Sequence, residues 1–183
     1  MSKLLMDYKS IRDSINLKED YWNNIKTTNC YAFALGLDIP SGKLMSFGIE
    51  SPYGVGNIGR FKFGYDYFDI YGLTFEERFF MDLDALEIQH REANQYEKMD
   101  SKNNNLNWLI AMYRDTKTPD FHFLRKRSDN FWTHKLGRDG DISIVDSTGR
   151  LITNLDNAKF HYVHKYETVD YEFKGVYKLT LKR

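Results

Sequence analysis

The stretch Thr27-Thr28-Asn29-Cys30-Tyr31-Ala32-Phe33-Ala34-Leu35-Gly36 decides how we interpret the rest of the chain. Thr28 or Asn29 can act as the N-cap of a short helix, the run CYAFAL is compatible with helix, and Gly36 is suited to end it. Cys30 then lies in the first turn, where unsatisfied backbone N–H groups and the helix dipole favour the nucleophilic thiolate. The stretch therefore predicts either a catalytic cysteine or a small buried apolar residue.

The composition is that of an ordered globular protein, and we expect a single domain over residues 1–183. The 26 basic and 26 acidic residues give a formal net charge of zero, which argues against nucleic acid or an anionic membrane as a partner. A single cysteine excludes an internal disulfide. Because we find neither the apolar core of a signal peptide nor a membrane-spanning run, we expect a cytoplasmic protein.

The first half of the chain favours helices and one long loop. Tyr8, Ile11 and Ile15 lie near helical spacing and predict a short amphipathic helix. Residues 37–71 read as a loop rich in aromatic side chains. Within it, GVGNIG at 54–59 matches the dinucleotide fingerprint GxGxxG. The fingerprint also requires a buried strand before it and a helix opening within it, and neither context is present.

A longer helix is predicted from Thr74 to about Lys98, since apolar residues recur there at helical intervals. Thr74 and Glu77 can form a capping box at its start. The helix also carries acidic residues and a histidine, which we interpret as a solvated face because ligands at these offsets do not converge on one metal ion. They are Asp82, Asp84, Glu87 and His90.

The second half changes to the two-residue period of strands. Runs typical of strands occur at 108–113, 120–125, 131–135, 141–145 and 171–181, with turns between them. Helices followed by an antiparallel meander indicate an α+β fold, in which N-terminal helices pack on an antiparallel sheet.

Two histidines lie on neighbouring predicted strands. A hairpin centred near Ser128 would place His122 directly opposite His134, with both side chains on the same face. A shift of one residue would pair His122 with Lys135 and turn His134 to the other face. The turn residues do not decide between these registers. In the first, both imidazoles could meet the N-terminus of the Cys30 helix, with His122 as base and His134 as the residue that orients it.

This order of Asn-Cys at a helix start, His on a strand and a polar residue on the next strand resembles the papain-like cysteine hydrolases. The NlpC/P60-type and CHAP-type branches are the most similar. The segments at 29–35, 120–123 and 132–137 are also similar to NCYAYAL-, DYHWYR- and WSHKPG-like segments of a set of bacterial and phage proteins. A D-x-x-G turn follows in those proteins and is matched by Asp146-Ser147-Thr148-Gly149.

The resemblance implies that residues 1–183 form a single cysteine-hydrolase-like domain with a papain-like core and a catalytic triad of Cys30, His122 and His134. Asp120 and Asp146 are the alternative residues for the third position. The implied reaction is hydrolysis of a peptide, isopeptide or other amide bond through an acyl-thioester on the cysteine. Its expected partner is a peptide or amide substrate, proteins included, and it needs no cofactor.

The same resemblance implies an oxyanion site beside the cysteine. The backbone N–H of Cys30 is its first donor, and one upstream side chain is the second. Asn24 is our first choice for that side chain, and Asn29 is the second.

Two other functions compete with catalysis. One is a catalytically inactive papain-like module that recognises a protein or small ligand in an aromatic cleft formed by residues 53–71. The other is a zinc site made by Cys30, His122 and His134, with an open position for water.

Overall fold

A computed structural model describes residues 8–22, 28–37, 72–99, 105–118, 120–136, 140–163 and 168–183. Within these residues the protein is α+β, with a mostly antiparallel sheet and few helices. The expected aromatic loop and the GxGxxG sequence at 54–59 lie outside the described residues. No helix in the described ranges is both long enough and apolar enough to cross a membrane.

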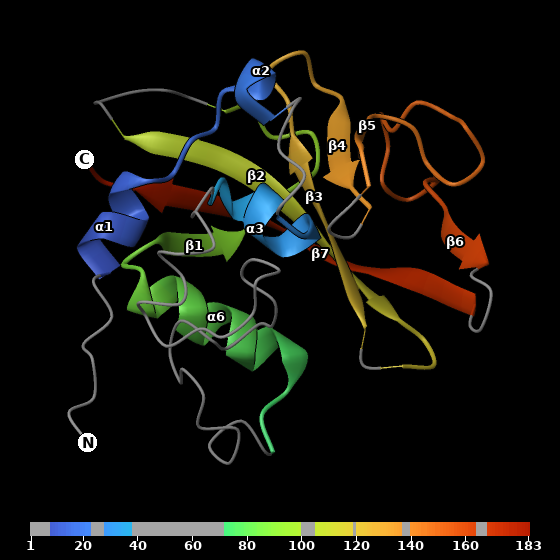
Figure 1. The fold of residues 1–183 in the computed structure, drawn as a ribbon, viewed down its shortest axis with the longest axis horizontal. Helices are drawn as coiled ribbons and strands as arrows, with labels where there is room; N and C mark the ends of the chain where they lie inside the picture. Colours follow the sequence, from blue (N-terminus) through green and yellow to red (C-terminus); the bar gives the residue numbers. More distant parts are fainter. Residues whose placement is uncertain are drawn as a thin grey trace.

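Seven strands form one sheet in the described chain, in the order β1-β7-β2-β3-β4-β5, with β6 pairing to β7. Four helices of the described residues precede these strands in the chain (Figure 1). The helices are α1 (Tyr8–Asp13), α2 (Glu19–Trp22), α3 (Cys30–Leu35) and α6 (Phe75–Ala85). The strands are β1 (Gln89–Glu92), β2 (Leu106–Asp115), β3 (Phe121–Lys126), β4 (Trp132–Lys135), β5 (Ile142–Ser143), β6 (Phe160–Val163) and β7 (Thr168–Leu181).

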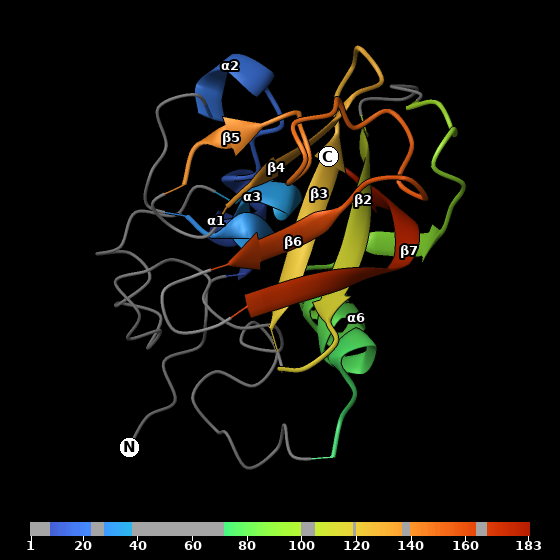
Figure 2. The ribbon, with the colours of Figure 1, turned by 90° about the vertical axis from the view of Figure 1, so that its right-hand side faces the viewer.

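The sheet buries both of its faces. On β2, Trp108, Ile110 and Met112 face a core shared with α3 and α6. The alternate residues Leu109 and Ala111 face a second core, which 152–160 helps to cover. Figure 1 shows α3 and α6 in front of the strands. After a quarter turn, Figure 2 shows β6 and the paired part of β7 nearest the viewer. The helices thus cover one face, and the β6 region covers part of the other.

Helix α3 begins and ends as its local sequence predicts. The side chain of Asn29 accepts a hydrogen bond from the backbone N–H of Ala32, which makes Asn29 the N-cap. Gly36 ends the helix with a left-handed φ of 75°. A Cβ on this glycine would lie 2.8 Å from Leu17 Cδ2, so both the backbone conformation and the close packing require glycine.

The prediction of one helix from Thr74 to Lys98 is wrong in its second half. α6 ends at Ala85, and Glu87 adopts a left-handed φ of 53°. The N–H of Ile88 then donates to Leu83 O at 2.8 Å, a bond that closes a Schellman motif although no glycine is present. Ile88 is buried, and the chain continues as β1, which pairs with β7 at the edge of the sheet. Burial of Ile88 therefore accompanies the unusual helix end.

The expected solvated acidic face is also wrong for one of its members. Asp82 is fully buried and accepts a 2.8 Å hydrogen bond from the hydroxyl of Tyr31 in α3. Asp84, by contrast, is exposed and lies 3.2 Å from the ring of His90. Asp82 thus links α6 to the helix that carries Cys30.

The capping box at the start of α6 has the geometry expected from its sequence. Thr74 Oγ1 accepts from Glu77 N, and the Glu77 carboxylate accepts from Thr74 N at 2.7 Å. Replacing Thr74 with alanine should lower the free energy of unfolding by about 1 kcal/mol, measured by urea denaturation. Thr153→Ala, at an exposed threonine, is the control and should change it by less than about 0.5 kcal/mol. Equal effects of the two changes would contradict a stabilising cap.

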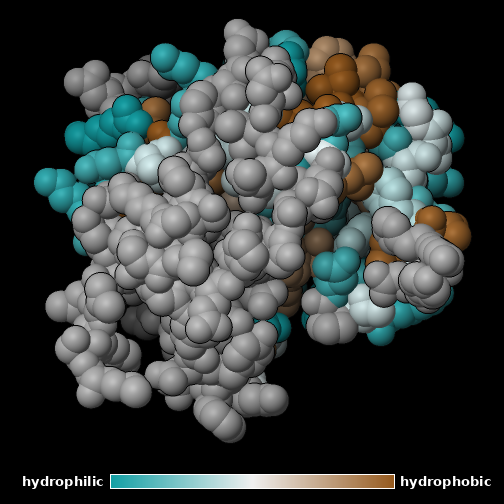
Figure 3. Space-filling view, viewed as in Figure 1, coloured by the Kyte–Doolittle hydropathy of each residue, from teal (hydrophilic) through white to brown (hydrophobic). Residues whose placement is uncertain are grey.

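Several large apolar side chains remain exposed in the described chain. They are Tyr96, Leu136, Leu151, Val163 and Phe173. On the face in Figure 3, apolar residues gather mainly in the right half of the view, the side on which Figure 1 draws β5 and β6.

Candidate active site

Cys30 is buried at the start of α3, which packs against β3 and β4. Its sulfur lies 3.8 Å from the carbonyl oxygen of Phe121, and the backbone N–H of Phe123 also bonds to it. β4 pairs with β3 only from Leu124 onward, so these two main-chain groups belong to a part of β3 that β4 does not cover. The thiol therefore lies beside the start of β3, at the main-chain groups on either side of His122.

His122 is joined to His134 by a direct hydrogen bond. Its Nε2 lies 2.9 Å from Nδ1 of His134, and Nε2 of His134 lies 2.8 Å from the carbonyl oxygen of Val145. Both histidines are buried, with exposures of 2% and 1%. The structure therefore brings the two predicted histidines together in one hydrogen-bonded chain.

The register that achieves this contact differs from the predicted one. Leu124, not His122, lies opposite His134, so the hairpin is centred on Asp129 instead of Ser128. A shift of two residues leaves both imidazoles on the same face, as diagonal neighbours. The side chain of Asp129 fixes this turn, because it accepts hydrogen bonds from Arg127 and from the backbone N–H of Phe131.

The hydrogen-bond chain fixes the tautomer of each neutral imidazole. Val145 O can only accept, so Nε2 of His134 carries a proton and Nδ1 of the same ring is an acceptor. Nε2 of His122 must then donate to that acceptor. Nδ1 of His122 is consequently unprotonated and is the ring nitrogen that can take up a proton.

The imidazole of His122 is held between aromatic rings on the face of the sheet opposite α3. Ring centroids of Phe160 and Tyr171 each lie 5.4 Å from that of His122. The hydroxyl of Tyr171 donates to Asp120 at 2.5 Å, across the start of β3. The negative charge of Asp120 also acts on the Cys30 thiol at the start of α3 and raises its pKa. The side chains of Cys30 and His122 thus lie on opposite faces of the sheet, Cys30 in the core under the helices and His122 against Phe160 of the second core.

Burial keeps the site in its neutral form. Desolvation raises the pKa of the Cys30 thiol to about 12, although backbone hydrogen bonds oppose this effect. Desolvation also lowers the pKa of His122 well below its usual value, and the neighbouring His134 lowers it further. The pKa of His134 is lowered by burial too. The expectation of a thiolate from the helix start alone is therefore wrong for this structure, because desolvation outweighs the helix terminus.

The alternative third members do not bond to His122. The carboxylate of Asp120 accepts hydrogen bonds from the hydroxyl of Tyr171 and from the N–H of Phe121.

The carboxylate of Asp146 stabilises its own turn, because it accepts hydrogen bonds from the N–H groups of Thr148, Arg150 and Lys159. Its negative charge nevertheless raises the pKa of His134. The ring of His134 is thus the group that bonds to His122.

Of the two predicted oxyanion residues, the structure describes only Asn29. Asn24 lies outside the described residues. The side-chain oxygen of Asn29 is the helix cap described above. Its role in binding an oxyanion therefore stays a prediction, as does that of the Cys30 backbone N–H.

The zinc alternative lacks the geometry that it needs. Among the described residues, no group of three His, Cys, Asp or Glu side chains is arranged to hold a metal ion. Both ring nitrogens of His134 are already engaged, by His122 and by Val145 O. A metal would have to displace at least one of these bonds to use His134 as a ligand.

Sequence reasoning missed Phe160, Tyr171 and Val145 as surroundings of the histidines. β6, which carries Phe160, was not predicted at all, whereas the alternation of 171–181 did place Tyr171 at the start of a strand. Comparison with known proteins adds no further assignment, since no family model, curated protein or solved structure matches the chain.

Proposed function

We propose that this protein is a papain-like cysteine hydrolase that cleaves a peptide, isopeptide or other amide bond. Cys30 is the nucleophile, His122 the base and His134 the residue that orients it. The observation that supports this proposal best is the hydrogen-bond chain from Val145 O through His134 to His122. It leaves the unprotonated Nδ1 on the residue whose two neighbours contact the thiol.

The resting state of the proposed enzyme is a neutral thiol beside a neutral imidazole. With a thiol pKa of about 12 and a lowered His122 pKa, a preformed ion pair does not accumulate at neutral pH. The proposal requires the Cys30 side chain to leave its main-chain partners and move toward Nδ1 of His122. Proton transfer then accompanies attack on the substrate, as in general-base catalysis.

The proposed reaction has two stages, formation of the thioester and its hydrolysis. In the first, the Cys30 thiol gives its proton to His122 Nδ1 while sulfur bonds to the amide carbonyl carbon, and the backbone N–H of Cys30 stabilises the oxyanion. The imidazolium then protonates the leaving amine as the C–N bond breaks, which leaves a thioester. In the second, His122 takes a proton from water, whose oxygen attacks the thioester. Acid product is released and the thiol is restored.

Trapping of the thioester tests this proposal without knowledge of the natural substrate. The protein is mixed with 4-nitrophenyl acetate, and mass spectrometry of peptide digests locates the acetyl group. We expect a burst of 4-nitrophenol with acetylation at Cys30, and no burst from Cys30→Ala. Release of 4-nitrophenol at the same rate from both proteins would show that the reaction does not use the cysteine.

The second candidate is an inactive binding module of the same fold. It is favoured by the burial of Cys30 and by the bonding of its thiol to main-chain groups. In that case the thiol is a packing residue, and the same experiment should give no acetylation of Cys30 in the folded protein. Acetylation that appears only in urea would show that the fold shields the Cys30 thiol from the reagent, as expected for a packing residue.

A further inference from the structure

A cavity lies at the end of β2 and β3 that is farther from Cys30. Its volume is about 380 Å³, which falls in the range of small-molecule sites. Trp108 near the start of β2 and Arg125 near the end of β3 both line it, whereas Cys30 contacts Phe121 at the start of β3. The cavity is therefore separate from the proposed active site.

Arg125 lines this cavity and is only 3% exposed, so its charged group is almost fully buried. Its Nη1 donates to the backbone oxygen of Phe33 at 3.0 Å. The central carbon lies 4.5 Å from the ring centre of Phe33 and 5.5 Å from that of Trp22. These contacts hold the group in place but use only part of its five N–H donors.

The remaining donors of Arg125 have no carboxylate partner in the described chain. No described Asp or Glu forms an ion pair with it. The nearest candidate is Glu19, whose charge raises the pKa of Arg125. Its carboxylate, however, accepts hydrogen bonds from Ser128 and lies 3.3 Å from Arg127. Among the residues that the structure describes, an almost fully buried cation thus lines a cavity without a direct counter-charge.

The other charged residues of the described cavity lining leave an excess of positive charge. Lys98 and Lys126 are basic, and Glu19 is the acidic member. Lys126 directs its ammonium to the backbone oxygens of Gln95 and Glu97, while Lys98 is exposed at the rim. A buried unpaired cation is costly, and an anion in the cavity would offset that cost.

We infer that this cavity binds a small organic anion through a carboxylate or phosphate group that pairs with Arg125 and Lys98. The guanidinium supplies planar, paired N–H donors that match either oxyanion, and the rim ammonium adds a second positive charge. Asn107, Ser128 and Asn130 supply further polar groups in the lining. The volume beyond the oxyanion accommodates the organic part of the ligand, against Trp108 and Met99.

Calorimetric titration tests this inference with two probes, inorganic phosphate and succinate, against chloride at equal ionic strength. We expect saturable binding of at least one probe at one site per chain, and the probe that binds identifies the oxyanion. Lys98→Met and Arg125→Lys should each weaken that binding by about tenfold or more, since each removes or misplaces a charge-assisted hydrogen bond. Lys117→Met is the matched control and should bind as the wild type does.

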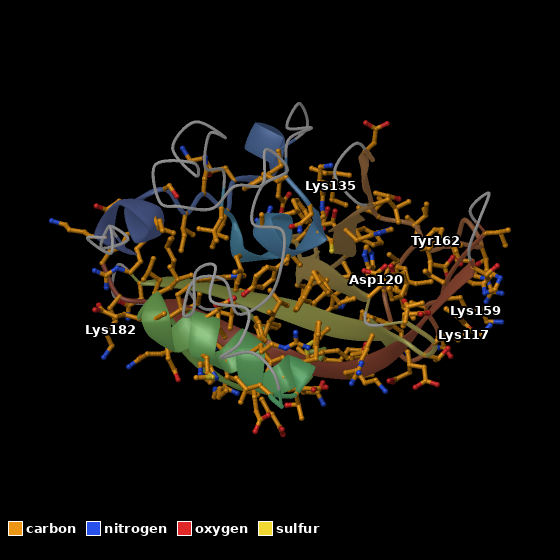
Figure 4. All side chains as sticks on the ribbon, turned by 60° about the horizontal axis from the view of Figure 1, so that its bottom comes forward. Lys117, Asp120, Lys135, Lys159, Tyr162 and Lys182 are labelled. Carbon is orange, nitrogen blue, oxygen red and sulfur yellow. The ribbon has the colours of Figure 1, made fainter. Side chains whose placement is uncertain are left out.

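Lys117 suits the control because it is an exposed lysine in the turn between β2 and β3, at the opposite end of these strands. Figure 4 shows it at the edge of the molecule. Absence of saturable binding for both probes would overturn the inference. So would equal affinities for the wild type, Lys98→Met and Lys117→Met. The comparison of Lys98→Met with Lys117→Met is decisive even if Arg125→Lys does not fold.

Discussion

Replacing His122 with asparagine should slow acetylation of Cys30 by about 10²- to 10⁴-fold, the usual contribution of a positioned general base. With the thiol pKa raised to about 12, very little thiolate exists at neutral pH without help from a base. Asparagine keeps a polar side chain at the buried position but cannot take up the thiol proton. Stopped-flow measurement of the 4-nitrophenol burst gives the rate.

His161→Asn is the matched control, because it makes the same substitution at an exposed histidine on β6. Its burst rate should equal that of the wild type. A burst in His122→Asn as fast as in the wild type would mean that the thiol reacts without this imidazole. Circular dichroism of each variant establishes that the rates refer to folded protein.

Two substitutions of His134 test whether it orients His122 through a hydrogen bond. In His134→Asn the side-chain oxygen can still accept from His122 Nε2, so much of the rate should remain. His134→Leu removes the acceptor and frees His122 to adopt the other tautomer, so its rate should fall toward that of His122→Asn. Equal rates for the asparagine and leucine variants would contradict a hydrogen-bonded orienting residue.

The second large effect is loss of stability in mild acid. Burial lowers the pKa of both His122 and His134 below the unfolded value of 6.5. Below that pH the unfolded chain binds protons that the folded chain does not, so stability falls as the pH falls. Each such histidine contributes a slope of about 1.4 kcal/mol per pH unit, and the pair about 2.7.

Urea denaturation between pH 7 and pH 5 measures this slope. In that window the carboxylates with lowered pKa values stay ionised in both states, so they add little. His134→Asn should lose about half of the slope that the pair contributes. A free energy of unfolding that does not fall from pH 7 to pH 5 would contradict neutral, buried histidines.

Local signals in the sequence were sufficient for part of this fold. The caps of α3 and α6 depend on the side chains of Asn29 and Thr74 acting on their own helices, and both form as expected. The long apolar run of β2 likewise stands out because both of its faces are buried. The predicted α+β class follows from such elements. The papain-like assignment belongs to the proposal.

Features set by packing between distant segments could not be predicted in this way. Glu87 in a left-handed conformation ends α6 without the glycine that usually marks such an end. Asp82 is buried because Tyr31, far away in sequence, donates to it. The same limit applies to the site, where Asp129 in the turn sets the register that brings His122 to His134. The raised pKa of Cys30 also reflects the whole core and not its helix alone.

The tautomers of the two histidines test the central claim most directly. Long-range ¹H–¹⁵N correlation spectra at pH 7 distinguish a ring protonated on Nε2 from one protonated on Nδ1 or on both nitrogens. We predict that His122 and His134 are both neutral and protonated on Nε2, which leaves Nδ1 of His122 free to receive the Cys30 proton. A proton on Nδ1 of His122 would contradict the account, because no base would then face the thiol.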